Sequence, residues 1–401
     1  MSQIKNERWP YGLAITLLLL SPFDILASLG MDIYLPIVPT LPNILGTSST
    51  VVQLTLTLYM LILGVGQLVF GPLSDVFGRR PVMVGGALLF SLSTLLLSVS
   101  TDANLFVLMR LMQAIGASAV LVAIFATIRD VYAGREESVV IYGLMGSILS
   151  FVPAIGPIMG AALLHLFGWR SIFLTLGLLS VIAVTLIAPK FRETRVLASV
   201  PATGGFNRVL GSRSFWVYSV SFGTSMGSFF VFLSTSPRIL VDGAGMNELQ
   251  FSLAFSTVAL VMVGTAFIAR RFVGNWGIPG SVVRGMGLLI LGSAFFATGS
   301  LFGSPTVWNV VLPMWIVAVG ITLTGAVTAN GALHDFDDIA GVATALYFCV
   351  QSVIVAIIGT GFVLVFDGDT IKPIIAYTAV MPLVAIGAIQ IHVRSVQGVD
   401  A

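Results

Sequence analysis

Charged residues are scarce in this chain. Only 9% of its 401 residues are Asp, Glu, Lys or Arg, whereas a soluble domain has about 25%. Hydrophobic residues make up 57%, and the mean hydropathy is +1.03. This composition excludes an ordinary soluble globular protein, and the long apolar runs predict an all-α protein that crosses a lipid bilayer many times.

Cysteine and histidine are also sparse. Cys349 is the single cysteine, so an internal disulfide is excluded. His165, His334 and His392 lie far apart and lack the spacing of metal ligands, so we expect no metal site. The sequence has neither a basic tail nor a nucleophile–base pair. We therefore expect no nucleic-acid partner, no cofactor and no enzymatic activity.

The apolar segments divide the chain into twelve predicted transmembrane helices. Their ranges are 11–35, 48–70, 82–100, 104–127, 138–162, 168–188, 214–236, 248–269, 282–302, 306–329, 339–364 and 372–392. We predict two pseudo-symmetric six-helix bundles, residues 1–195 and 214–401, joined by a cytoplasmic linker at 196–213.

The positive charges are distributed unevenly between the two sides of the predicted helices. Most of the 19 Lys and Arg residues fall in the connections on one side, whereas Arg170, Arg238 and Lys372 fall in loops on the other. By the positive-inside rule, the richer side and both termini are cytoplasmic.

Two carboxylates, Asp24 and Asp32, interrupt the first apolar segment. A charged Asp at the centre of a bilayer costs about 2.5–3.5 kcal/mol, so such residues usually face the protein interior and have a function. On a helix, eight residues separate the two acids by about 12 Å and about 80°. One acid is therefore expected deep in the membrane and the other near an exit.

Arg110 is the other charge that we place well inside an apolar segment. It lies about 9 Å below the outer end of span 4, and Asp24 lies about 16 Å below the outer end of span 1. A guanidinium can bridge much of that difference, so Arg110 can poise a carboxylate between its protonated and charged forms. Asp24, Asp32 and Arg110 are therefore the candidates for proton coupling. The alternative is a fixed ion pair that only holds helices together.

A distinctive turn joins predicted spans 2 and 3. It reads Gly71-Pro72-Leu73-Ser74-Asp75-Val76-Phe77-Gly78-Arg79-Arg80-Pro81. We predict that Gly71, Asp75, Gly78, Arg79 and Arg80 form a conformational latch between the two halves, with Asp75 paired to a guanidinium or a helix N-terminus. A basic turn without a further role is the alternative.

Span 5 combines two prolines with two glycines, Pro153, Gly156, Pro157 and Gly160. Gly156 and Gly160 form a small face for close helix contact, and the prolines remove amide donors and bend the helix. Simple tight packing is the alternative to a role in transport.

A set of mainly aromatic side chains is suited to line a cavity for an apolar ligand. The predicted lining of this cavity is Asp24, Ser28, Tyr59, Arg110, Phe151, Met226, Phe229 and Phe230. An aromatic or Met side chain taken alone more often contacts lipid or packs against other helices than it lines a cavity.

These motifs resemble those of the drug:proton antiporters of the major facilitator superfamily, above all the phenicol exporters, which extrude chloramphenicol and florfenicol. Beside the turn and the span-5 motif, the likeness rests on Leu20–Pro36, Arg129–Ala133, Met226–Phe232 and Ala329–Leu333. The corresponding second-half turn, 270–284, keeps little of the pattern. The resemblance implies that Asp24 and Arg110 are essential for efflux, that Asp32 is a second coupling acid, and that span 5 carries the antiporter motif.

The resemblance further implies a monomer in the bacterial inner membrane, driven by the proton gradient, that exports a small neutral aromatic drug by alternating access. Its partners are then the drug, protons and the lipid bilayer. Three alternatives stay open: an exporter of an endogenous sugar-like or peptide-like metabolite, a broader multidrug exporter, and a membrane sensor that binds ligand without moving it.

Overall fold

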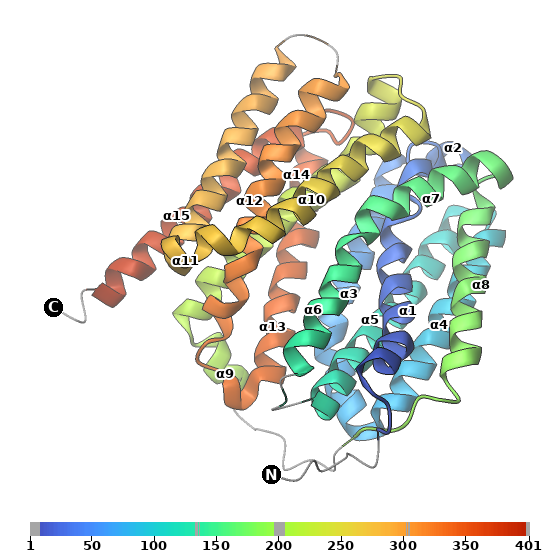
Figure 1. The fold of residues 1–401 in the computed structure, drawn as a ribbon. Coiled ribbons are helices and arrows are strands. Elements are labelled where there is room, and N and C mark those ends of the chain that lie inside the picture. The colour runs from blue at the N-terminus through green and yellow to red at the C-terminus, as the bar shows by residue number, and fades with distance from the viewer. Residues whose placement is uncertain are drawn as a thin grey trace.

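The computed structural model describes residues 9–132, 135, 137–195, 205–301, 303 and 305–397. Within these residues, 12 helices are long and apolar enough to cross a membrane, which confirms the predicted transmembrane fold. We call residues 9–195 the N-terminal half and residues 205–397 the C-terminal half. The blue and green helices of the first half lie on one side of Figure 1, and the orange and red helices of the second lie on the other.

Seven long helices form the six spans of the N-terminal half. They are α1 (Leu13–Asp32), α3 (Ser49–Phe77), α4 (Arg79–Val99), α5 (Ala103–Tyr132), α6 (Glu137–Ser150), α7 (Val152–Phe167) and α8 (Arg170–Ile187). Two short elements, η1 (Leu35–Ile37) and α2 (Leu41–Leu45), follow α1. The predicted helix at 138–162 is thus two helices that meet at Phe151, because Pro153 in the first turn of α7 has no amide to continue the hydrogen bonds of α6.

The C-terminal half repeats six spans with several breaks. Its elements are α10 (Arg213–Pro237), η2 (Arg238–Gly243), α11 (Glu248–Ser300), α12 (Val307–Leu333), η3 (Asp337–Ile339), α13 (Ala340–Val353), η4 (Ile354–Gly359), α14 (Thr360–Val365) and α15 (Lys372–Gln397). The long α11 contains two spans, because Gly277 has a φ of 66° and interrupts the helix. Gly78, between α3 and α4, also has a positive φ, of 104°, so the degenerate second-half turn keeps one feature of the first.

The two ends of the molecule carry different short helices. Helix α9 (Gly205–Leu210), which belongs to the predicted linker, lies at the bottom of Figure 1, and α2 lies at the top. Linker residues 196–204 lie outside the described part of the chain. Below, the α9 end and the α2 end refer to these two ends.

Helix α10 is rich in buried hydroxyl groups. Five of them donate to carbonyl oxygens three or four residues earlier in α10 itself: Ser221, Ser225, Ser228, Ser234 and Thr235. These side chains are therefore satisfied without a partner on another helix.

Candidate functional site

Arg110 of α5 is held against the end of α1. Its side chain is buried, and its Nη1 donates to the carbonyl oxygen of Gly30 at 2.7 Å and to Gln113 Oε1 at 2.5 Å. The guanidinium carbon lies 4.3 Å from the ring centroid of Tyr34 and 4.6 Å from that of Tyr59. Because α1 ends at Asp32, the Gly30 carbonyl belongs to the last turn, which lacks helical donors. Arg110 thus caps the negative end of the α1 dipole.

A second set of contacts fixes the groups around Arg110. Gln113 Nε2 donates to Thr94 Oγ1 at 2.8 Å, and the Tyr59 hydroxyl donates to the carbonyl oxygen of Ala27 at 2.7 Å. A Cβ on Gly30 would lie 2.5 Å from the Tyr59 hydroxyl oxygen, so only glycine leaves room for this tyrosine. The arginine is consequently held in one position by α1, α3 and α5 together.

Asp24 and Asp32 are both buried on α1, with 2% and 6% of their surface exposed. Within the described residues, neither carboxylate oxygen of Asp24 has a hydrogen-bond partner, and neither acid forms an ion pair with Arg110. The reach of Arg110 toward Asp24 expected from depth counting is therefore not realised in this conformation. Arg110 keeps two nitrogens, Nε and Nη2, without a hydrogen-bond acceptor in the same part of the chain.

The span-5 glycines bring α7 against the end of α1. A Cβ on Gly156 would lie 3.0 Å from the Cβ of Asp32, and a Cβ on Gly160 would lie 1.8 Å from the carbonyl oxygen of Ile33. Pro157 is buried inside α7, and Pro153 lies in its first turn. The motif therefore makes the close helix contact that the sequence predicts, and it makes this contact at the second acid.

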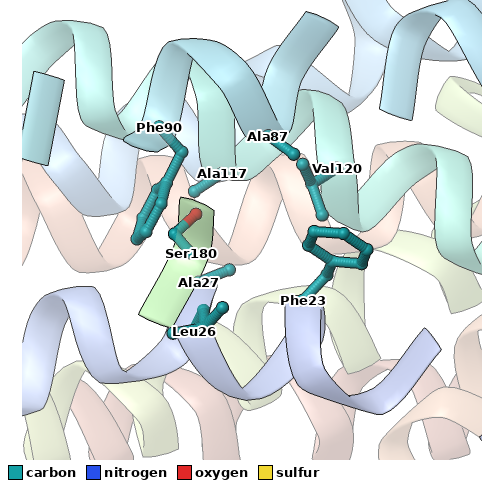
Figure 2. A pocket seen from close by; sticks show the side chains of 8 residues that line it. All are labelled: Phe23, Leu26, Ala27, Ala87, Phe90, Ala117, Val120 and Ser180. Carbon is teal, nitrogen blue, oxygen red and sulfur yellow. The ribbon is translucent and has the colours of Figure 1, made fainter. Parts of the chain in front are cut away.

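A small void lies on the neighbouring face of α1 (Figure 2). It is lined by Phe23, Leu26, Ala27, Ala87, Phe90, Ala117, Val120 and Ser180. Its volume of about 10 Å³ is no larger than the space of one water molecule, whereas a drug needs about 300 Å³ or more. This void is therefore not the substrate cavity, and none of the predicted lining residues borders it.

The predicted substrate residues fall into separate groups. Tyr59 stacks on Arg110, and Ser28 is half-buried on α1. On α10, Met226 is partly buried, the Phe229 ring lies 6.0 Å from that of Phe255, and Phe230 is buried against Gly359. Phe151 is 44% exposed at the junction of α6 and α7. Of the aromatic side chains in this set, the structure places Tyr59 against the Arg110 guanidinium.

The side-chain partners of the predicted latch belong to the N-terminal half. Arg79 contacts Asp75 at 2.6 Å and Asp130 at 2.8 Å. The Glu193 carboxylate accepts hydrogen bonds from the backbone amides of Arg79, at 2.8 Å, and Arg80, at 3.1 Å. Gly78 permits this approach, because a Cβ there would lie 2.4 Å from Glu193 Oε2, whereas Gly71 has free space around it. In this conformation the turn therefore fastens α3, α4 and α5 to each other.

The burial of two polar residues at the α2 end, Arg238 and Gln53, was not expected from the sequence. Arg238, which the charge pattern placed in an outer loop, has a side chain that is only 10% exposed and pairs with Asp369. Its Nη2 also donates to Gln53 Oε1, on α3, at 3.4 Å. The sequence alone does not predict this burial, because Asp369 and Gln53 each lie more than a hundred positions away from Arg238.

The comparisons with known proteins agree with this architecture. The family model described as Major Facilitator Superfamily matches residues 23–360. The chain belongs to the major facilitator superfamily. It is a multi-pass membrane protein, and the family to which it belongs is a family of transporters.

Several known proteins resemble the chain over most of its length. A protein named chloramphenicol resistance protein, from Pseudomonas aeruginosa, is 46% identical over 96% of this chain and 92% of its own. An uncharacterized MFS-type transporter of Bacillus subtilis, YdgK, is 32% identical over 82% and 83% of the two chains. The multidrug resistance protein MdtL of Shewanella oneidensis is 26% identical over 80% and 82%.

Proposed function

We propose that the protein is a proton-coupled antiporter that exports phenicol antibiotics and thereby confers resistance to chloramphenicol and florfenicol. The name and the 46% identity of the Pseudomonas aeruginosa relative support the substrate class. The observation that carries the coupling is Asp24, whose two oxygens are buried without a hydrogen-bond partner among the described residues. A buried carboxylate without partners costs least in its protonated form, so its charge can change as the site alternates between closed and open.

The cycle uses alternating access between the two halves of a monomer in the bacterial inner membrane. The α9 end faces the cytoplasm, because most Lys and Arg residues lie in the connections on that side. A neutral aromatic drug enters from the cytoplasm or the inner leaflet and hydrogen-bonds through its hydroxyl and amide groups to Asp24. Protonation of Asp24 or Asp32 from the periplasm then favours release, and deprotonation toward the cytoplasm resets the site.

The two nitrogens of Arg110 that have no acceptor among the described residues give the second acid a role in this scheme. Asp32 is the last residue of α1, and Arg110 donates to the carbonyl of Gly30 two residues before it, where Gly30 and Gly156 keep the packing tight. A shift of α1 against α5 replaces the Gly30 carbonyl by an ionised carboxylate as the acceptor for Arg110. Exchange of a neutral drug for a proton moves charge inward, so a membrane potential contributes about 2.3 kcal/mol per charge per 100 mV.

Uptake of labelled florfenicol and chloramphenicol into inverted membrane vesicles tests the proposal. We expect accumulation that requires an imposed proton gradient and is lost in Asp24→Asn, while drug binding persists. Asp102→Asn is the matched control, because Asp102 is exposed and only caps α5, a task that Asn also performs. Gradient-driven uptake by Asp24→Asn at the wild-type rate would refute the assignment of this acid.

The same assay separates the alternative functions. Uptake of cationic drugs beside phenicols would indicate the broader range suggested by the name of the MdtL relative. Competition by sugars or dipeptides would indicate a metabolite exporter. Binding without accumulation, in vesicles shown to be energised, would indicate a sensor.

A further inference from the structure

Arg238 lies where the seventh span ends at the α2 end of the molecule. It directly follows Pro237 and begins η2, and its side chain is only 10% exposed. A buried guanidinium is strongly destabilising unless its charge is paired. The residues that pair with Arg238 therefore determine which arrangements of the two halves are stable.

One partner belongs to the same half. The Arg238 guanidinium pairs with the Asp369 carboxylate, in the loop between α14 and α15. Gly368 lets this loop cover the arginine, because a Cβ there would lie 2.8 Å from Arg238 Nη2. Asp367, with a φ of 64°, accepts a hydrogen bond from the Asp369 amide at 3.2 Å. The loop is thus shaped to hold the carboxylate at the guanidinium.

The other partner belongs to the opposite half. Gln53, in the second turn of α3, accepts a hydrogen bond from Arg238 Nη2 at 3.4 Å. One turn further along the same face, Thr57 and Thr360 share a hydrogen bond of 2.7 Å that also joins the halves. Helix α3 therefore meets the C-terminal half through polar contacts at the α2 end.

The two partners of Arg238 differ in kind. The ionic contact with Asp369 lies within one half and persists when the halves separate, so no buried charge is left unpaired. The contact with Gln53 is a single long bond to a neutral group, and Gln53 Nε2 and Arg238 Nε have no partner in the described residues. Separation at this end thus breaks a weak bond and keeps the strong one.

We propose that Gln53, Arg238 and Asp369 form a gate that closes the α2 end, with Asp369 holding Arg238 in every state and Gln53 holding it only when the gate is closed. This inference rests on the alternating-access cycle of the proposed function, and it is independent of the drug carried. Gln53 and Arg238 act as positioning residues, since they set the ratio of closed to open molecules.

Spin labels across the α2 end test the gate without a substrate. The labels replace Thr101, between α4 and α5, and Leu249, at the start of α11, in a Cys349→Ser background; both side chains are exposed. Distances between the labels are measured by pulsed electron paramagnetic resonance in the full-length protein. We expect Gln53→Met and Arg238→Lys each to raise the ratio of wide to narrow distances about three- to tenfold, the effect of one hydrogen bond.

The double variant and the controls distinguish a gate from general loosening. Because both changes remove the same bond, the double variant should match the single ones rather than multiply them. Gln390→Met and Arg170→Lys change exposed residues, on α15 and at the start of α8, that are not members of the gate, and they should leave the distribution unchanged. Distributions that are the same in wild type and in the gate variants, or effects that multiply in the double variant, would overturn the gate. Failure of phenicol uptake would leave this result intact.

Discussion

Gly160 and Ile33 approach each other so closely that a Cβ on the glycine would lie 1.8 Å from the isoleucine carbonyl oxygen. The obstructing atom belongs to the backbone, so it has no side-chain rotation with which to yield. The contact fixes α7 against the end of α1, one residue away from Asp32. The position of Asp32 therefore depends on Gly160, in α7, having no side chain.

Gly160→Ala should destabilise the protein by about 1–3 kcal/mol, the usual cost of overpacking. Gly143→Ala is the control, since a Cβ at that position in α6 would meet no other side chain or element of the described residues within 4 Å and alanine favours a helix. Thermal unfolding in detergent should show opposite shifts for the two variants. Equal midpoints would contradict the close contact.

Arg110→Lys should reduce gradient-driven transport about tenfold or more. Lysine keeps the charge but lacks the planar group that bonds Gly30 and Gln113 while lying between Tyr34 and Tyr59. Vesicle uptake measures the loss, with the exposed Arg170→Lys as control. Near-wild-type uptake would mean that charge alone suffices at this position.

Tyr59→Phe should lower stability by about 1 kcal/mol and leave drug affinity within about twofold, because its hydroxyl already donates to the Ala27 carbonyl. The ring that faces Arg110 is retained. Unfolding and equilibrium binding of labelled florfenicol check the two parts, with the exposed Tyr142→Phe for comparison. A large loss of affinity with unchanged stability would instead place the hydroxyl at the drug.

Glu193→Ala should loosen the first turn of α4, because the carboxylate is the acceptor for the amides of Arg79 and Arg80. Loss of such a cap costs about 0.5–2 kcal/mol. Hydrogen exchange of peptides that cover this turn should accelerate, whereas the exposed Glu137→Ala, at the start of α6, should leave α4 unaffected. Unchanged exchange in α4 would mean that other contacts hold the turn.

The helices were predictable because a span of apolar residues has few alternatives to a transmembrane helix. The break at Phe151 was missed, although Pro153 gave the signal. Burial of Asp24, Asp32 and Arg110 was also predictable, since each interrupts an apolar run.

The partners of these charges were less predictable. The depth of a residue along a helix follows from counting residues. The acceptor of Arg110 depends instead on where α1 ends. Because α1 ends at Asp32, the carbonyl of Gly30 is available to accept from Arg110. Arg238 illustrates the same limit. Its charge is paired with Asp369, which only the folded chain brings near.

The hydroxyl groups of α10 have a mechanical consequence. A polar helix usually becomes fixed by bonds to its neighbours, but Ser221, Ser225, Ser228, Ser234 and Thr235 donate to carbonyls of α10 itself. Rotation or sliding of α10 against adjacent helices would leave those bonds intact. These five hydroxyl groups therefore make α10 polar without tying it to an adjacent helix.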